Sequence, residues 1–224
     1  MLKPRQKFTQ KQVKEDKLVS TITKIQTYIE TDWQRIILIG ASAIVILLII
    51  VLIYKHNKSS EEEASAKLYQ IEFSFIERQI YNDQLIQQLQ GYLKNYKNTS
   101  SGSIAQFYLG TAYYQLGRYS EAEEQYTNFL KTGDGPGFLK SSALGGIAAS
   151  YCQRSMYKEA AEYYQRAVKE YPGEFNTPEN MLGAARMLVK IGNKEGAIQQ
   201  CKKLIEQYPT VKEAREAEVL LAQL

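Results

Sequence analysis

An uncharged apolar run, IILIGASAIVILLIIVLIY, extends from Ile36 to Tyr54, with Arg35 before it and Lys55 after it. At about 1.5 Å per residue, a helix of this length spans roughly 28 Å, close to the ~30 Å hydrocarbon layer of a membrane. Trp33 and Tyr54 stand where amphipathic rings favour the membrane–water interface. The pattern therefore predicts one transmembrane helix over 36–54, with membrane lipid around it.

The same run has to be compared with a signal peptide. It exceeds the 7–15 apolar residues typical of a cleaved signal, and a 35-residue segment precedes it. The sequence Ala64-Ser65-Ala66 has the form of a cleavage site, but it follows a polar stretch well beyond the run. We expect an uncleaved signal anchor, with a cleaved signal peptide as the alternative.

Charge is distributed unevenly along the chain, whose formal net charge is +4. Residues 1–35 hold eight Lys or Arg and four Asp or Glu, whereas the rest of the chain holds 20 of each. A uniformly basic nucleic-acid-binding protein would not show this distribution, whereas a tail beside an anionic membrane surface would, so we expect no nucleic acid partner. The basic tail favours a cytoplasmic N-terminus, although the charges nearest the run balance on its two sides.

The segment before the run has helical periodicity. Its apolar residues recur every three or four positions, at Leu18, Ile22, Ile25, Ile29 and Trp33. We expect an amphipathic helix over 11–35, which either packs as a short helix or docks at the membrane surface or on a membrane partner. Residues 1–10 are polar and predict a disordered basic tail. Residues 55–60 are expected to be a linker.

Self-similar segments follow the linker. Residues 106–130 contain Leu109-Gly110-x₂-Tyr113, then Leu116-Gly117-x-Tyr119, then Ala122-x₃-Tyr126. Related units align on Ala160 and Ala197, so that Ala122, Ala160 and Ala197 lie 38 and 37 residues apart. The pattern closely resembles the 34-residue tetratricopeptide repeat, a hairpin of two helices, with slightly longer links. Small residues, Gly110, Ala148 and Ala185, suit the close helix crossings. The tyrosines expected to fill gaps between hairpins are Tyr113, Tyr126, Tyr151 and Tyr164.

The positions of glycine and proline fit this interpretation. Gly117 and Gly192 suit left-handed turns between the helices of a hairpin. Pro172 and Pro209 are expected to end second helices. We therefore predict an all-α fold: a single transmembrane helix followed by a tetratricopeptide-type α-solenoid. Its parts are a degenerate first hairpin at 61–98 (helices near 61–78 and 83–96), three hairpins at 101–210 and a C-terminal capping helix at 211–224.

The inventory of chemically active residues is short. The one histidine, His56, adjoins the apolar run, and the two cysteines, Cys152 and Cys201, form no CxxC motif. Cys201 is expected to be a buried small hydrophobic residue, and Cys152 to face the groove, with a bond between the two as an open alternative. We expect no catalytic residues, no metal and no cofactor, and therefore a protein that is not an enzyme.

Binding is expected on the concave face that the first helices of the hairpins form. Projection of the repeat geometry selects Phe107, Thr111, Tyr114 and Gln115 from one hairpin, Gln153 with Cys152 from the next, and Arg186, Val189 and Lys190 from the third. Tyr114 and Phe107 would hold an apolar side chain of a peptide. Arg186 and Lys190, one helical turn apart, would hold a carboxylate or an acidic segment.

The order of basic tail, apolar anchor and repeats resembles, over nearly the whole chain, the bacterial ancillary Sec-translocon subunit family. The residues that carry the resemblance are the 36–54 run, the unit from Leu109 to Ala122, and the Tyr-Pro pairs at 171–172 and 208–209. Members of that family sit in the inner membrane with a periplasmic repeat domain, linked to the translocon and to periplasmic chaperones.

The resemblance implies a single-pass protein of the bacterial inner membrane, with its N-terminus cytoplasmic and its repeat domain periplasmic. It implies a non-enzymatic scaffold whose protein partners are the Sec translocon or chaperones. The alternatives are a structural subunit of a larger envelope complex, such as the division, secretion or motility machinery, and a regulator of an envelope enzyme.

Overall fold

The computed structural model describes the backbone of residues 10–224, and the side chains of these residues except 10–18, 25–32 and 36. The chain divides into two units, residues 1–56 and residues 57–224, and each is described by itself. The expected disordered tail at 1–10 lies outside the described residues apart from Gln10. So do Leu18, Ile25 and Ile29 of the expected amphipathic face, whose side chains are not described.

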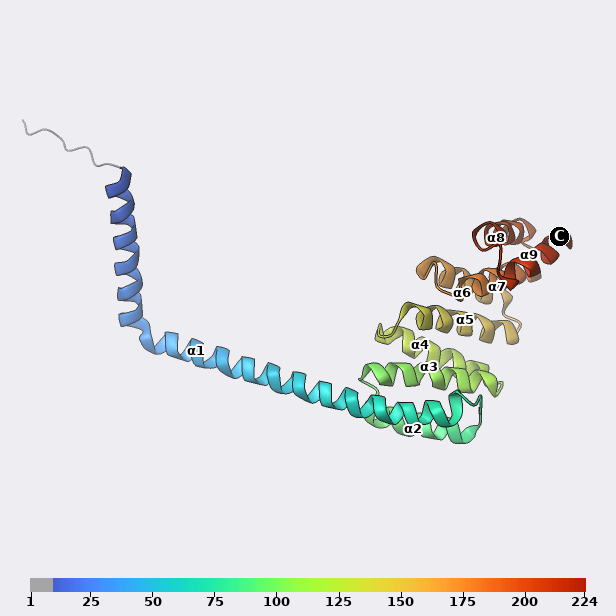
Figure 1. The fold of residues 1–224 in the computed structure, drawn as a ribbon, viewed down its shortest axis with the longest axis horizontal. Coiled ribbons are helices and arrows are strands. Elements are labelled where there is room, and N and C mark those ends of the chain that lie inside the picture. Colours follow the sequence, from blue (N-terminus) through green and yellow to red (C-terminus); the bar gives the residue numbers. More distant parts are fainter. Residues whose placement is uncertain (1–9) are drawn as a thin grey trace, which may run out of the picture. The chain divides into compact units, whose positions relative to one another are not determined.

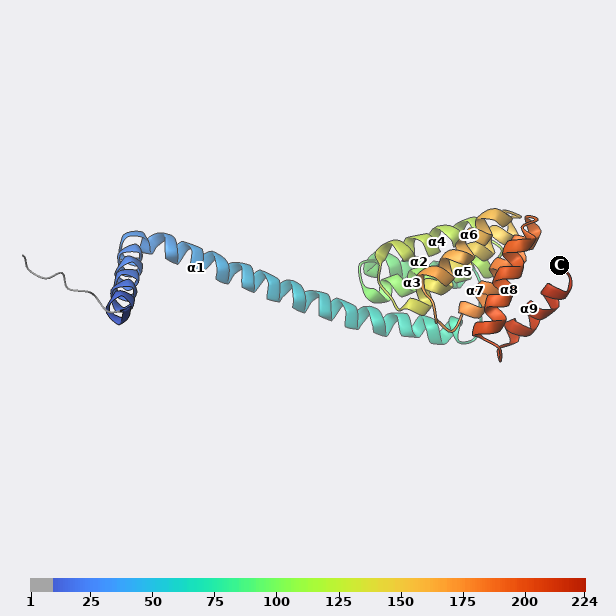
Figure 2. The same ribbon diagram turned by 90° about the horizontal axis from the view of Figure 1, so that it is seen from above.

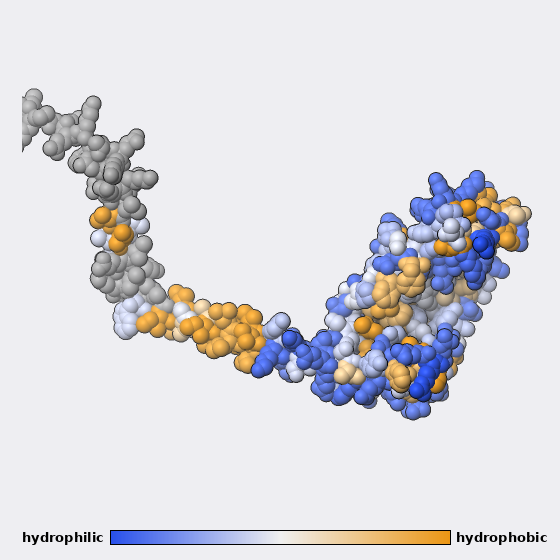
Figure 3. Space-filling view, in the orientation of Figure 1, coloured by the Kyte–Doolittle hydropathy of each residue, from blue (hydrophilic) through white to orange (hydrophobic). Residues whose placement is uncertain are grey.

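In its described residues, 10–56, the first unit is the N-terminal part of one helix, α1 (Gln10–Ile71). The described side chains of the 36–54 run are exposed, and Figure 3 shows them as an almost continuous apolar surface. Within the described residues, the helical stretch Trp33–Ile76 is long and apolar enough to cross a membrane, by length and composition. A signal sequence near the N-terminus has the same length and composition. What these two properties establish is one long apolar N-terminal helix.

Residues 55–60, expected to be a linker, are helical, since α1 continues through them to Ile71, and the boundary between the two units falls among them. The segment KHNKSS contains no Pro and no Gly, so nothing in it ends a helix. The first helix of the first hairpin therefore does not begin at Glu61. It ends in a π-helical segment, η1 (Glu72–Ile76), which places Phe75 in the core.

The second unit is a stack of helical hairpins in chain order, as Figures 1 and 2 show from two directions. After η1 the elements are α2 (Asp83–Tyr96), α3 (Ser100–Gln115), α4 (Tyr119–Thr132), α5 (Gly137–Gln153), α6 (Tyr157–Glu170), α7 (Thr177–Lys190), α8 (Lys194–Gln207) and α9 (Lys212–Ala222). Each helix packs against the next, and α9 covers both α7 and α8. The fold is an all-α repeat of stacked helices.

The last turns of α1 are part of this stack. Ala64 and Leu68 are buried in the same core as Leu85 of α2 and Leu109 of α3. Glu61 caps the start of α3, since its carboxylate accepts hydrogen bonds from the backbone N–H groups of Ser100 and Ser101 at 2.8 and 2.9 Å. The degenerate first hairpin is therefore joined to the second by burial and by a cap.

The core is built from small residues that face tyrosines. Ala148 and Ala185, expected at close helix crossings, are fully buried. The ring of Tyr126 on α4 lies against Gly146 of α5 in the next hairpin, where an added Cβ would stand 2.5 Å from Cε2. The ring of Tyr164 lies in the same way against Gly183 of α7. The expectation that tyrosines fill the gaps between hairpins is confirmed for this pair.

The turns and helix ends occur at the glycine and proline positions that predict them. Gly117 and Gly192 have φ of 74° and 78°, the left-handed conformation expected for them. The helices α6 and α8 end just before Tyr171-Pro172 and Tyr208-Pro209. The middle hairpin differs, because Ser155 occupies the left-handed position with φ of 60°.

Candidate functional site

The first helices of the hairpins lie closer together than the second helices. Helix α3 contacts α5, α5 contacts α7, and α7 contacts α9, whereas contacts among α2, α4, α6 and α8 are weaker. A stack whose helices approach more closely in one layer curves toward that layer. The layer of α3, α5 and α7 is therefore the concave one, as in other repeat proteins of this architecture.

A cavity of about 230 Å³ opens on this layer, and we call it the inner groove. It is lined by residues that recur at helical spacing on one face of each first helix, together with two tyrosines from second helices. These residues are Thr111, Tyr114 and Gln115 of α3, Ser142, Gly145, Gly146 and Ala149 of α5, Glu179 and Asn180 of α7 with Asn176 just before it, and Tyr126 and Tyr164.

Small residues of α5 let neighbouring side chains pack against its backbone. A Cβ added to Gly145 would stand 2.6 Å from Asn180 Oδ1, and one added to Gly146 would stand 2.5 Å from Tyr126 Cε2. Contacts this short do not occur in folded proteins without movement of a neighbour. The two glycines thus let the amide of Asn180 and the ring of Tyr126 approach the helix backbone and line the groove.

Two asparagines form the polar wall on the α7 side. Asn176 is 7% exposed, and its Nδ2 donates to Ser142 Oγ at 2.8 Å and more weakly to the Phe138 carbonyl at 3.5 Å. Asn180 is 4% exposed and donates to the buried Ser141 Oγ at 3.1 Å. The Oδ1 atom of Asn176 is buried and has no hydrogen-bond partner.

The titratable groups of the groove are phenols and one carboxylate. The Tyr126 hydroxyl donates to Thr111 Oγ1 at 3.1 Å. Burial raises the pKa of Tyr126 to about 12, although the hydrogen bond to Thr111 lowers it in part. Burial also raises the pKa of Tyr164, and the nearby Glu179 carboxylate adds to that effect. Of the described residues that line the groove, Glu179 alone is charged.

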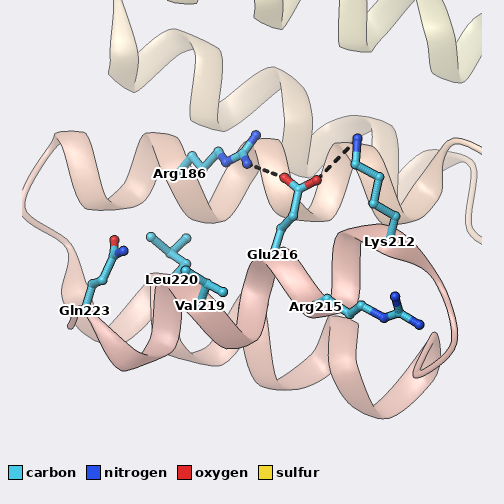
Figure 4. Close-up of a pocket in the computed structure, with 7 residues that line it drawn as sticks. All are labelled: Arg186, Lys212, Arg215, Glu216, Val219, Leu220 and Gln223. Carbon is cyan, nitrogen blue, oxygen red and sulfur yellow. Dashed lines mark hydrogen bonds and ion pairs between the residues drawn. The ribbon is translucent and has the colours of Figure 1, made fainter.

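A second cavity of about 520 Å³ lies between α7 and α9, and we call it the terminal cleft. Figure 4 shows Arg186 of α7 directed toward Glu216 of α9, with Lys212 on the other side of the carboxylate. The Arg186–Glu216 and Lys212–Glu216 ion pairs measure 2.5 and 3.4 Å. Partial burial acts to raise the pKa of Glu216, but hydrogen bonds from the two cations hold it below its usual value.

Four of the binding residues that the sequence predicts line one of these two cavities. Thr111, Tyr114 and Gln115 line the inner groove together. Arg186 lines the terminal cleft, where Glu216 already neutralises it. Phe107 packs inside its hairpin, with ring centroids 5.5 Å from Tyr126 and 5.7 Å from Phe129.

The remaining selected residues line neither cavity. Val189 packs against the core between α6 and α7, as does Cys152. Lys190 is exposed, with its ammonium 6.0 Å from the centre of the Tyr157 ring, and Gln153 is exposed at the end of α5. Cys201 is fully buried, as expected, and both thiols are free.

Sequence reasoning missed Asn176, Glu179 and Asn180. Their spacing of three and four residues at the start of α7 places them on one face of the helix, and this could have been noticed. The Gly145-Gly146 pair was a second available signal, because two adjacent glycines inside a helix are costly unless close packing requires them.

Comparison with known proteins agrees with this architecture. Two tetratricopeptide-repeat family models match the chain, one over residues 86–137 and 107–175 and the other over residues 179–210. No curated protein matches it significantly.

Two solved structures share the fold. A tetratricopeptide repeat protein from Parabacteroides merdae is 20% identical with a TM-score of 0.58, over 73% of this chain and 59% of that one. The chain thus spans less than two thirds of that relative. TPR-like repeats assigned to a kinesin light chain from Podospora anserina are 14% identical with a TM-score of 0.53, over 74% and 83% of the two chains.

The fold, the groove and the family matches define a helical repeat scaffold of a class that is generally non-enzymatic. The chain belongs to the tetratricopeptide-repeat proteins, and it is a protein-binding scaffold.

Proposed function

We propose that this protein is a non-enzymatic scaffold anchored in the bacterial inner membrane, which holds a protein partner in its inner groove at the Sec translocon or among periplasmic chaperones. The observation that carries the proposal is that one chain joins an uncharged apolar helix of membrane-spanning length to a repeat unit with a lined groove. An anchor confines the groove to the membrane surface, where translocating chains and their chaperones are met.

The apolar helix supports anchoring by its energetics. Eighteen consecutive apolar or small residues of α1, from 37 to 54, are exposed to solvent in the chain by itself. Each exposed apolar side chain of this size favours transfer out of water by about 1.5–3 kcal/mol. Lipid around Ile36–Tyr54 removes this cost, and the basic tail before the run supports a cytoplasmic N-terminus with the repeat unit in the periplasm.

The inner groove supports protein binding as the activity. Its lining carries hydroxyl and amide groups, such as those of Tyr114 and Gln115, that can form hydrogen bonds with a partner. None of the residues that line it forms a nucleophile–base pair of the kind that catalysis requires. The arrangement suits recognition of an extended segment.

Crosslinking in native membranes followed by affinity capture of the full chain tests this function. The expected result is recovery of a translocon subunit or a periplasmic chaperone, reduced when the groove is filled by the Ala149→Trp substitution, because Ala149 lines the groove and is only partly buried. Stoichiometric recovery of a division, secretion or motility complex without these components would instead identify the protein as a structural subunit of that complex. Recovery of neither would contradict the proposal.

A further inference from the structure

The inner groove offers hydrogen-bond acceptors and negative charge on the side of α7. From these groups we infer that the groove selects a positively charged donor, the side chain of a Lys or Arg in an extended segment of its protein partner. The inference rests on the proposed scaffold function and adds the chemistry of the ligand. It differs from the acidic ligand that Arg186 and Lys190 predict from the sequence.

The orientation of the Asn176 amide is fixed by its neighbours. One of its two terminal atoms lies 3.5 Å from the carbonyl oxygen of Phe138, and a carbonyl can only accept a hydrogen bond. That atom must therefore be Nδ2, which also donates to Ser142 Oγ. The oxygen, Oδ1, is then buried and without a hydrogen-bond partner, in a residue that lines the groove.

A buried acceptor without a partner costs free energy until a donor reaches it. The atom is closed to solvent as the structure stands, so a donor from an occupant reaches it only after a side chain of the wall moves. An ammonium or a guanidinium supplies several donors and no acceptor, whereas a carboxylate supplies none. A basic side chain would therefore suit this oxygen once it is opened, and a carboxylate would not.

Charge leads to the same conclusion. Glu179 is exposed, lies three residues after Asn176, and is the one charged residue among the described residues lining the groove. The nearest basic residue toward the end of the same helix, Arg186, bonds to Glu216 in the terminal cleft. A cation in the groove would find a carboxylate for an ion pair, and an anion would be repelled.

The aromatic walls add to this preference. Tyr114 and Tyr164 both line the groove, and a cation is attracted to the face of an aromatic ring by about 0.5–2 kcal/mol according to its exposure. The volume of about 230 Å³ is below the roughly 300–1,000 Å³ of pockets for drug-sized molecules. The space is therefore of the size of a single long side chain.

The test uses the full chain in nonionic detergent and three short fluorescein-labelled peptides that are identical except for a central Lys, Gln or Glu. Fluorescence anisotropy measures the dissociation constant of each. We expect the Lys peptide to bind roughly tenfold more tightly than the Gln peptide, with the Glu peptide weakest, and the preference to shrink as salt is raised.

Two substitutions assign the preference to Glu179. Glu179→Gln should abolish the advantage of the Lys peptide over the Gln peptide, and Glu179→Lys should make the Glu peptide the tighter ligand. Glu162→Gln is the matched control, since Glu162 is an exposed carboxylate of α6 that does not line the groove, and it should leave all three constants unchanged.

The proposal is overturned if the wild type binds the three peptides equally, prefers the Glu peptide or binds none of them. It is also overturned if Glu179→Gln keeps the preference for Lys. These outcomes are independent of the scaffold function, because capture of a translocon or chaperone component from native membranes can succeed while the ligand chemistry is wrong.

Discussion

The ring of Tyr126 on α4 lies directly against Gly146 on α5, so that a Cβ at position 146 would stand 2.5 Å from Cε2 of the ring. The same ring lies against Gly110 of α3 on its other side. Tyr126 therefore joins two hairpins and at the same time lines the inner groove. The Tyr126–Gly146 contact therefore contributes both to the stability of the stack and to the shape of the inner groove.

This contact predicts the effect of Gly146→Ala. Alanine should favour the helix by about 1 kcal/mol, but overpacking against a ring that is itself buried costs about 1–3 kcal/mol. We expect a net loss of about 1 kcal/mol in the free energy of unfolding by urea, measured by circular dichroism of the full chain in detergent.

Gly91→Ala is the matched control, because Gly91 is an exposed residue inside α2 with no atom within 4 Å of an added Cβ. It should stabilise the protein by about 1 kcal/mol. Equal effects of the two substitutions would show that the Tyr126–Gly146 contact is not tight.

Ser155 provides a second test at the turn of the middle hairpin. Its N–H donates to the Cys152 carbonyl and the next N–H donates to the Tyr151 carbonyl, the same pattern that Gly117 and Arg118 make. A non-glycine residue at positive φ carries a cost of about 1–2 kcal/mol. Ser155→Gly should therefore raise the free energy of unfolding by about 1 kcal/mol, and Gly117→Ser should lower it by a similar amount. An unchanged urea midpoint in both variants would exclude strain at this position.

Tyr126 also predicts how stability depends on pH. Burial raises its pKa to about 12 in the folded protein, whereas an unfolded tyrosine titrates near 10. Above about pH 10 the unfolded chain gives up a proton that the folded chain retains, so stability is full below pH 10 and is lost as pH rises toward 12.

Urea midpoints at about pH 9 and about pH 11 measure this loss. Tyr126→Phe removes one buried phenol, so its midpoint should fall less between the two pH values than that of the wild type. The slope should not vanish, because burial raises the pKa of Tyr164 as well. An unchanged slope would mean that Tyr126 ionises as freely in the folded chain as in the unfolded one.

Much of the repeat unit follows from its sequence. Gly117 and Gly192 mark left-handed turns, and Pro172 and Pro209 follow the ends of helices, because these residue types act locally on the backbone. The buried alanines follow from their periodicity. Local rules and helical spacing are therefore sufficient to predict the hairpins and their order.

The groove was harder to predict, because it depends on how whole hairpins pack. Phe107 and Thr111 lie on nearby faces of α3. Helix α4 covers Phe107, however, whereas Thr111 lines the inner groove. Arg186 was selected as a free cation, but only the position of α9 decides that Glu216 meets it. The end of a helix can be predicted from sequence where a Pro or Gly stands. The polar segment 55–60 contains neither, and it is helical although a linker was expected there.

The apolar helix makes a prediction about membrane attachment. The full chain should resist extraction by alkaline carbonate, and replacement of the 36–54 run by a Gly/Ser linker should release it. Tryptic peptides from residues 1–35 should remain with the membrane-bound chain, and protease added to spheroplasts should digest the repeat unit. Loss of residues 1–35 from the mature protein would identify the run as a cleaved signal instead.

Site-specific photo-crosslinking in native membranes tests the central claim, that a partner is held in the inner groove, most directly. The crosslinking residue is placed at Gln115, which lines the groove, or at Lys169, an exposed residue of α6 that does not. A discrete adduct of higher mass from position 115, and none from position 169, is the predicted result. Adducts of equal yield from both positions, or an adduct from position 169 alone, would contradict binding in the groove.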